Sequence, residues 1–179
     1  MTRRCAAPSL AARKMLKLTV TAETSATPEQ VLADAGTDFS AHRAKVWPNV
    51  TVKRLEVHEL GDSYAEVTEG ATGIAWFAWE RSRYDWSRPG TVKQTVLDSN
   101  VLEPGSTWEL CVAPRDGGGS DLQLTFELRF RREATGRVAA ALNHIAGRLG
   151  FGWMLRSALK EVERAPARST GPDPAKAAA

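Results

Sequence analysis

The stretch DLQLTFELRFRREATGRVAAALNHIAGRLG, residues 121–150, decides the fold because its hydrophobic period changes part-way along. Up to residue 130 every second side chain is apolar, which predicts a strand with one dry face and one wet face. The dry face carries Leu122, Leu124, Phe126, Leu128 and Phe130. After residue 136 the apolar side chains recur at steps of three and four, as on one face of a helix. They are Val138, Leu142, Ile145 and Leu149. We therefore expect a long C-terminal helix that covers the dry face of a sheet.

The predicted helix continues to residue 163, but its apolar stripe is displaced in the second part. There the stripe consists of Leu155, Leu159 and Val162. Gly150 and Gly152 lie between the two stripes, and glycine weakens the helical preference of the backbone. We expect the helix to bend near these glycines.

Residues 16–114 predict the rest of the sheet. Alternation over 16–26 marks a first strand, Thr27-Pro28 begins a short helix that ends near Gly36, and Pro48 ends a second short helix. Turn residues then separate further strands, at 50–60, 63–70, 71–86, 91–102 and 107–114. The predicted fold class is α+β, with a curved antiparallel sheet of about six to seven strands and two short helices after the first strand.

Composition indicates one globular domain. The chain has 179 residues, of which 42% are hydrophobic and 25% charged. We expect the domain over residues 15–163, between disordered tails at 1–14 and 164–179, with Met15 an alternative start. The basic residues of the first tail, Arg3, Arg4, Arg13 and Lys14, and the basic second tail account for more than the formal net charge of +3. The domain itself is slightly acidic, which argues against nucleic-acid binding.

Several classes of chemistry have no signature in the sequence. The only cysteines are Cys5 and Cys111, and there is neither a secretory signal nor an apolar run that could span a membrane. A cytoplasmic protein is the expectation. The three histidines lack metal-ligand spacing, and Gly117 to Gly119 are typical of a hairpin turn rather than a phosphate loop. We expect no metal and no cofactor.

Strand parity selects polar side chains that face the helix, provided that the strands contain no bulge. In residues 74–86 the face with Ile74 and Ala78 also carries Trp76, Glu80, Ser82, Tyr84 and Trp86. In residues 91–100 the face with Val92 and Val96 also carries Gln94, Asp98 and Asn100. Trp108 joins the same inner face from the next strand.

Buried carboxylates are costly unless a cavity or a partner compensates them. Glu80 and Asp98, near Tyr84, are therefore candidates for orienting a ligand or for general acid–base catalysis. In the alternative interpretation, Asp98 and Asn100 cap the strand end and Glu80 pairs with a nearby arginine. The small Gly152 beside Trp153 predicts a gap under the helix. The complete predicted ligand-binding set is Trp76, Glu80, Tyr84, Gln94, Asp98, Asn100, Trp108, Gly152 and Trp153.

The segments WERSRYDW at 79–86 and DSNVLEPGSTWEL at 98–110, the glycine turn and the terminal helix resemble the START-like family. This is also called the polyketide cyclase/dehydrase and Bet v 1-like (SRPBCC) superfamily. The resemblance covers about residues 16–163 and contains no catalytic signature. It implies a helix-grip fold with a cavity between the sheet and the long helix. Different members use that cavity to carry lipids and hormones or to cyclise polyketide chains.

Three functions stay open on the sequence alone. The leading hypothesis is a non-catalytic carrier or sensor of a hydrophobic or amphipathic small molecule. The second is a polyketide cyclase or aromatase, a lyase or isomerase in which Glu80, Tyr84 or Asp98 supplies the acid or base. The third is a protein-interaction module, with a homodimer formed through outward Phe77 and Trp79.

Overall fold

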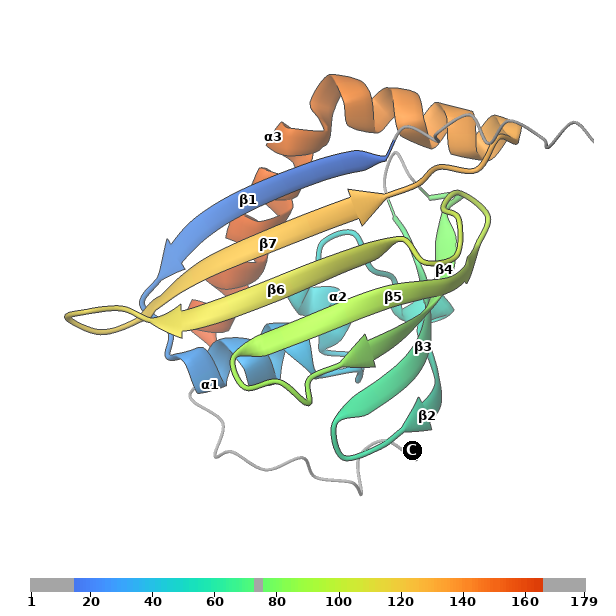
Figure 1. The fold of residues 1–179 in the computed structure, drawn as a ribbon. Helices are drawn as coiled ribbons and strands as arrows, with labels where there is room; N and C mark the ends of the chain where they lie inside the picture. Colours follow the sequence, from blue (N-terminus) through green and yellow to red (C-terminus); the bar gives the residue numbers. More distant parts are fainter. Residues whose placement is uncertain (1–14, 73–75, 166–179) are drawn as a thin grey trace, which may run out of the picture.

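In the computed structural model, residues 15–72 and 76–165 are described, and they form a seven-stranded antiparallel sheet under a long helix (Figure 1). The strand order is β1-β7-β6-β5-β4-β3-β2. The strands are β1 (Leu16–Thr24), β2 (Glu56–Leu60), β3 (Tyr64–Gly70), β4 (Trp79–Asp85), β5 (Thr91–Ser99), β6 (Thr107–Pro114) and β7 (Ser120–Leu128). The helical segments are α1 (Pro28–Val31), η1 (Leu32–Gly36), α2 (Arg43–Val46), η2 (Val52–Arg54) and α3 (Ala134–Arg164). The predicted α+β architecture is confirmed.

The two short helical segments after β1 form where the sequence predicts them. Thr27 caps α1, because its side-chain oxygen accepts a hydrogen bond from the backbone N–H of Gln30, and Pro28 occupies the first helical turn. The indole of Trp47, directly after α2, donates to the carbonyl of Ala35 at 2.8 Å. This bond ties α2 to η1, and both segments pack into the core through the buried residues Ala35 and Val46.

The core lies between the inner face of the sheet and the last turns of α3. The predicted dry face of β7 is confirmed, since Leu122, Leu124, Phe126 and Leu128 are all buried. The residues of α3 that bury against this side are Leu155, Ala158, Leu159 and Val162. Full burial of one such aliphatic side chain is worth about 1.5–3 kcal/mol.

Polar contacts also hold the end of α3 against the connection between β1 and α1. The Gln30 amide donates to the carbonyl of Val162 at 2.8 Å. The Glu163 carboxylate accepts from the Thr24 hydroxyl at 2.7 Å and from the Ser25 backbone at 3.0 Å. The second half of α3, residues 151–164, is therefore fixed by both apolar and polar contacts.

The first half of α3, residues 134–150, differs from the prediction. The apolar stripe that was expected to cover the sheet is exposed to solvent. The exposed fractions are 50% at Val138, 40% at Leu142, 82% at Ile145 and 76% at Leu149. The buried positions are small residues, Gly136 and Gly147. The prediction was wrong because period alone tells which residues share a face, and not what that face meets. Figure 1 shows that α3 changes direction between its orange first part and its redder second part.

Parts of the sequence prediction lie outside the described residues. These are the tails at 1–14 and 166–179 and the segment 73–75, which includes Ile74. The domain boundaries stay a prediction. Within the part of the chain that is described, no helix is both long and apolar enough to cross a bilayer.

Candidate functional site

A charged cluster is buried on the inner face of the sheet, below α2. Arg43 projects from α2, and its Nε donates to Oε1 of Glu69 on β3. Its Nη2 donates to the hydroxyl of Tyr84 on β4 at 3.0 Å. That hydroxyl donates in turn to Oε2 of Glu69 at 2.5 Å. The three side chains close a ring of hydrogen bonds, and their residues are only 2%, 8% and 0% exposed.

Two more polar side chains extend this cluster along β4 and β5. The Gln94 amide donates to Oε1 of Glu80 at 2.5 Å and to the Ser82 hydroxyl at 2.7 Å. The sheet register places Glu80 opposite Glu69, and Gln94 opposite Tyr84. We name these six residues the inner polar cluster: Arg43, Glu69, Glu80, Ser82, Tyr84 and Gln94.

The environment shifts the pKa values of three of these groups. Burial raises the pKa of Glu80 to about 7, because desolvation penalises the carboxylate and outweighs the hydrogen bond from Gln94. Burial, together with the charge of Glu69, raises the pKa of Tyr84 well above its ordinary value, so the phenol stays protonated. For Arg43 burial acts to lower the pKa, but Glu69 and Tyr84 outweigh it and the net shift is upward. The Arg43 cation therefore lies in one cluster with the carboxyl of Glu69 and with a second carboxyl, Glu80, whose pKa lies near neutrality.

The inner polar cluster retains hydrogen-bonding capacity that no described residue uses. Within residues 15–72 and 76–165, neither Nη1 of Arg43 nor Oε1 of Gln94 has a hydrogen-bond partner. Leaving a buried donor or acceptor unpaired costs about 1–3 kcal/mol. Nη1 is a donor and Oε1 is an acceptor, so the cluster offers both to a further polar group.

Aromatic rings surround the cluster. The ring of Tyr84 contacts Phe39 with centroids 4.8 Å apart and Trp108 with centroids 5.8 Å apart, both edge to face. Trp108 also lies 6.4 Å from Trp47. The Arg43 guanidinium stands 4.8 Å from the Phe39 ring centroid and 4.9 Å from that of Tyr84. The cation is thus held by aromatic faces as well as by Glu69.

The inner face is not sealed toward the first half of α3. Glu80 and several core-packed apolar side chains remain only half-buried: Leu16, Leu18, Phe77, Ala78, Trp108, Phe130, Phe151 and Met154. The buried residues of that part of the helix are Gly136 and Gly147, which have no side chain to fill space. Half-buried apolar side chains with partial access to solvent therefore lie beside the inner polar cluster.

Asp98 does not face the helix as parity predicted. A β-bulge in the pairing of β4 with β5, between Arg81 and Ser82, shifts the alternation, so that Asp98 is exposed and Ser99 is buried. Asp98 forms an ion pair with Arg131 at 2.8 Å. The backbone N–H of Trp79 donates to Oδ1 of Asn100 at 2.9 Å, and Nδ2 of Asn100 donates to the backbone carbonyl of Phe77 at 2.8 Å. For Asn100 this matches the capping alternative.

Trp76 and Trp153 also lie away from the inner polar cluster. Trp76 is 65% exposed, because β4 begins only at Trp79. Trp153 is 59% exposed, because it continues the exposed side of α3. Gly152 is buried, but the guanidinium of Arg156 lies over it, and a Cβ there would stand 3.3 Å from Nη1. Of the predicted set, Glu80, Tyr84, Gln94 and Trp108 come together, and Trp76, Asp98, Asn100, Gly152 and Trp153 do not join them.

Three cluster residues were not in the predicted set. Parity did place Ser82 on the inner face, although Ser82 was not named as a ligand-binding residue. Glu69 could have been found, because the same parity rule applied to residues 64–70 places it on one face with Ala65 and Val67. Arg43 has no comparable signal, since a four-residue helix gives no periodicity that could orient it.

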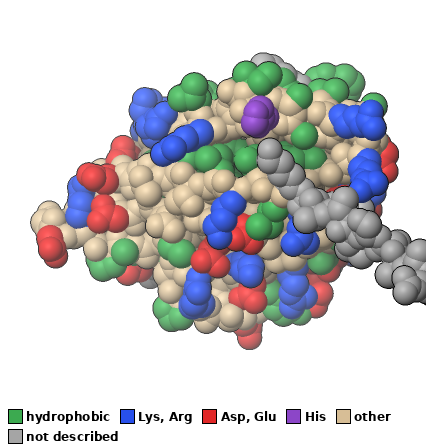
Figure 2. Space-filling view, turned by 45° about the horizontal axis from the view of Figure 1, so that its top comes forward, with side chains coloured by type: hydrophobic (Ala, Val, Ile, Leu, Met, Phe, Trp, Pro, Cys, Tyr) green, Lys and Arg blue, Asp and Glu red, His purple; other side chains and the backbone are tan. Residues whose placement is uncertain are grey.

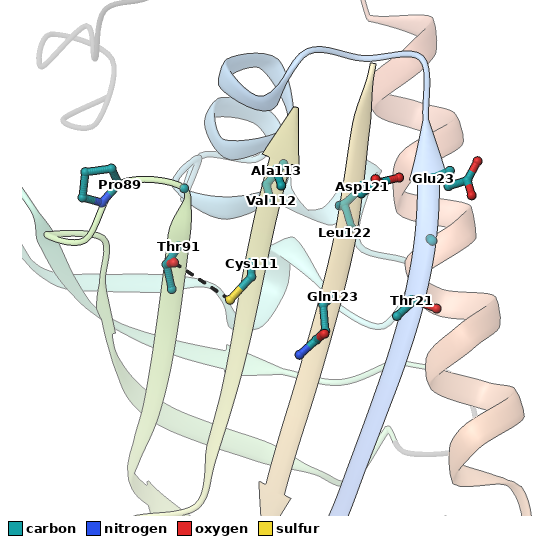
Figure 3. A pocket seen from close by; sticks show the side chains of 12 residues that line it. Thr21, Glu23, Pro89, Thr91, Cys111, Val112, Ala113, Asp121, Leu122 and Gln123 are labelled. Carbon is teal, nitrogen blue, oxygen red and sulfur yellow. Dashed lines mark hydrogen bonds between the residues drawn. The ribbon is translucent and has the colours of Figure 1, made fainter. Parts of the chain in front are cut away.

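A shallow hollow lies on the opposite, outer face of the sheet (Figure 3). It is lined by residues of β1, β5, β6 and β7 and by Pro89 and Gly90 before β5, and the Thr91 hydroxyl contacts Sγ of Cys111 at 3.9 Å on its β5 side. The whole sheet separates it from the inner polar cluster. Among the described residues no group of three His, Cys, Asp or Glu side chains could hold a metal ion.

No protein-family model and no curated protein matches the sequence. Solved structures do match. The Zhui aromatase/cyclase from Streptomyces sp. R1128 superposes with a TM-score of 0.69 at 18% identity, over 84% of this chain and 95% of the other. A START superfamily protein from Mycobacterium smegmatis gives 0.62 at 12% identity, over 83% and 97%. Ara h 8.0201 gives 0.55 at 12% identity, over 85% and 100%.

The fold is a helix-grip fold of the SRPBCC type, as in these three structures. At these identities the similarity establishes the SRPBCC-type fold and nothing about the chemistry inside it. The inner polar cluster described above is a property of this chain's own residues.

Proposed function

We propose that this protein binds an amphipathic small molecule between the sheet and α3, as a carrier or sensor. The observation that carries this proposal is the buried donor of Arg43 and acceptor of Gln94 that no described residue satisfies. A fold that buries a cluster with open hydrogen bonds loses stability unless a ligand or water completes it.

The chemistry of the two atoms indicates the polar end of the ligand. A hydroxyl or phenol group can satisfy either atom, because it can accept from Nη1 of Arg43 or donate to Oε1 of Gln94, whereas a carboxylate could serve only the arginine. The half-buried rings of Trp108, Phe130 and Phe151 suit an apolar body of the same molecule. The ligand class is therefore an apolar compound, aromatic or aliphatic, with one or more hydroxyl groups.

Native mass spectrometry of gently purified protein tests this proposal, followed by titration with a fluorescent hydrophobic probe. We expect a co-purified species or a saturable probe site. Gln94→Leu should weaken binding by roughly tenfold, because it removes the acceptor. Gln123→Leu, an exposed glutamine on the outer face, is the matched control and should bind normally. No bound species together with no saturable site would refute the proposal.

A second candidate function is acid–base catalysis, favoured by the pKa of about 7 at Glu80. A carboxyl that titrates near neutrality can both take and give a proton at physiological pH. In an aromatase or cyclase reaction this group would move the proton, and neutral Tyr84 would donate a hydrogen bond. Glu80→Gln should then lower kcat on polyketide-like substrates by about 10²–10⁴. The control is Glu109→Gln on the outer face, and unchanged turnover in Glu80→Gln would remove this role.

The same residue predicts a pH dependence of stability. The folded-state pKa of Glu80, about 7, lies above the ordinary value of 4.5 for a glutamate, so the native state binds the extra proton. Stability falls as the pH rises from 4.5 to 7, and the whole cost is present above 7. Glu80→Gln should be more stable than the wild type at pH 8, by up to about 3 kcal/mol, and this difference should vanish below pH 4.5. Urea denaturation at both pH values measures it.

A further inference from the structure

One face of α3 is strongly apolar and open to solvent. We call it the exposed stripe, and it consists of Val138, Leu142, Ile145, Leu149 and Trp153, which are 50%, 40%, 82%, 76% and 59% exposed. Their spacing of three and four residues aligns them within one side of the helix. The stripe runs for about 23 Å at 1.5 Å per residue. Figure 2 shows hydrophobic side chains gathered along the top of the molecule, where α3 lies, with basic side chains beside them.

The charges around the exposed stripe have one sign. Arg137, Arg148 and Arg156 are exposed on the same helix, and no Asp or Glu occurs from residue 134 to residue 160. By helical geometry Arg137 and Arg148 follow one flank of the stripe, about 100° from its middle. An apolar stripe with a basic flank is typical of a helix that lies on an anionic surface.

This charge pattern disfavours the occupants that the chain itself offers. A second copy pairing stripe to stripe would bring the same arginines together with no carboxylate on this part of either helix. The chain's N-terminal segment, residues 1–14, carries Arg3, Arg4, Arg13 and Lys14 and no acid, so it is also repelled.

We propose that the exposed stripe docks this protein on a membrane surface that contains anionic lipids. The apolar side chains enter the boundary between headgroups and acyl chains, the arginines reach the phosphates, and Trp153 lies at the interface. The apolar side chains and the flanking arginines supply the two signals, one hydrophobic and one electrostatic, that stable peripheral binding requires.

Co-sedimentation of the full chain with vesicles tests the proposal. Vesicles of phosphatidylcholine with about one third phosphatidylglycerol should bind it at low salt, and pure phosphatidylcholine should bind it far more weakly. The double variant Ile145→Gln/Leu149→Gln should lose at least about tenfold in affinity. The matched control is Val52→Gln/Leu60→Gln, since these residues are 52% and 50% exposed elsewhere on the surface. Circular dichroism melts verify that both variants fold.

A charge variant and a spectroscopic readout separate the components. Arg137→Gln/Arg148→Gln should reduce both the affinity and its salt dependence. Wild-type tryptophan emission should shift to the blue on anionic vesicles, and this shift should shrink in Trp153→Phe and persist in Trp76→Phe, whose ring is 65% exposed on a turn.

Four results would overturn the proposal. The first is wild-type protein that stays in the supernatant with anionic vesicles, and the second is a stripe variant that binds them as tightly as the wild type. The third is a change of molar mass, measured by light scattering, from dimer to monomer in the stripe variant, which would identify a second copy as the occupant. Saturable binding of an acidic amphipathic peptide without binding of vesicles would likewise assign the stripe to a protein partner.

Discussion

The two halves of α3 have the same helical pattern and opposite environments. In the second half the apolar residues from Leu155 onward face the sheet, and Leu155, Leu159 and Val162 are 2%, 3% and 0% exposed. In the first half the bulky apolar residues are exposed, and the buried residues are glycines. The second half holds the fold together, whereas the first half leaves the inner face partly open and presents a surface to a partner. Apolar periodicity therefore has two meanings within one helix, core packing and external docking.

The largest test of this comparison uses one leucine from each half. Leu159→Ala removes a side chain that is 3% exposed and should lower the free energy of unfolding by about 2–4 kcal/mol. Leu149→Ala, at a position that is 76% exposed, should change it by less than about 0.5 kcal/mol. Chemical denaturation of both variants measures the difference. Equal losses would show that the first half also packs against the core.

A smaller test addresses the polar anchor of the second half. Hydrogen bonds from the Thr24 hydroxyl and the Ser25 backbone hold the pKa of Glu163 below its usual range. A lowered carboxyl pKa stabilises the fold above the unfolded value of 4.5, and this contribution is lost as the pH falls. Glu163→Gln should cost roughly 1 kcal/mol at pH 7, since the carboxylate is largely exposed, and the difference should fade near pH 3.

Melting curves of Glu163→Gln and of Glu161→Gln, a neighbouring glutamate on the same turn, provide the comparison. A loss of the same size in both variants would mean that general surface charge, and not the anchor to Thr24, is responsible.

The smallest expected effect lies at Gly150, in the first half. A Cβ added there meets nothing within 4 Å, and the residue is helical. Gly150→Ala should therefore stabilise the protein by up to about 0.5–1 kcal/mol, through helical preference alone. Thermal unfolding measures the gain. A destabilised variant would show that the helix needs its flexibility at this point.

The sheet was predictable because its strands alternate. Leu122 to Leu128 on β7 showed the dry face, and parity placed Glu80, Tyr84 and Gln94 inward, where the structure has them. Half of the inner polar cluster could therefore be predicted by counting residues along two strands.

The rest depended on tertiary contacts. A single bulge between Arg81 and Ser82 turned Asp98 outward, and alternation does not reveal a bulge. Arg43 reaches the cluster only because α2 packs over the sheet, and the four residues of α2 carry no signal of that packing. Which face of the first half of α3 is buried depended on the bend of the helix and on the burial of its small residues, Gly136 and Gly147. Short elements and irregular pairings escape prediction because their orientation is set by their neighbours.

The pairing of β1 with β7 has a consequence for the order of folding. Leu16 pairs with Leu128 and Thr24 with Ser120, so the first strand of the domain finds its neighbour only after about a hundred further residues. During synthesis β1 therefore waits, unpaired, until β7 has left the ribosome, and folding is slow compared with that of a helical bundle. The hydrogen bond between Glu163 and Thr24 forms later still, because the last turns of α3 are synthesised after the whole sheet.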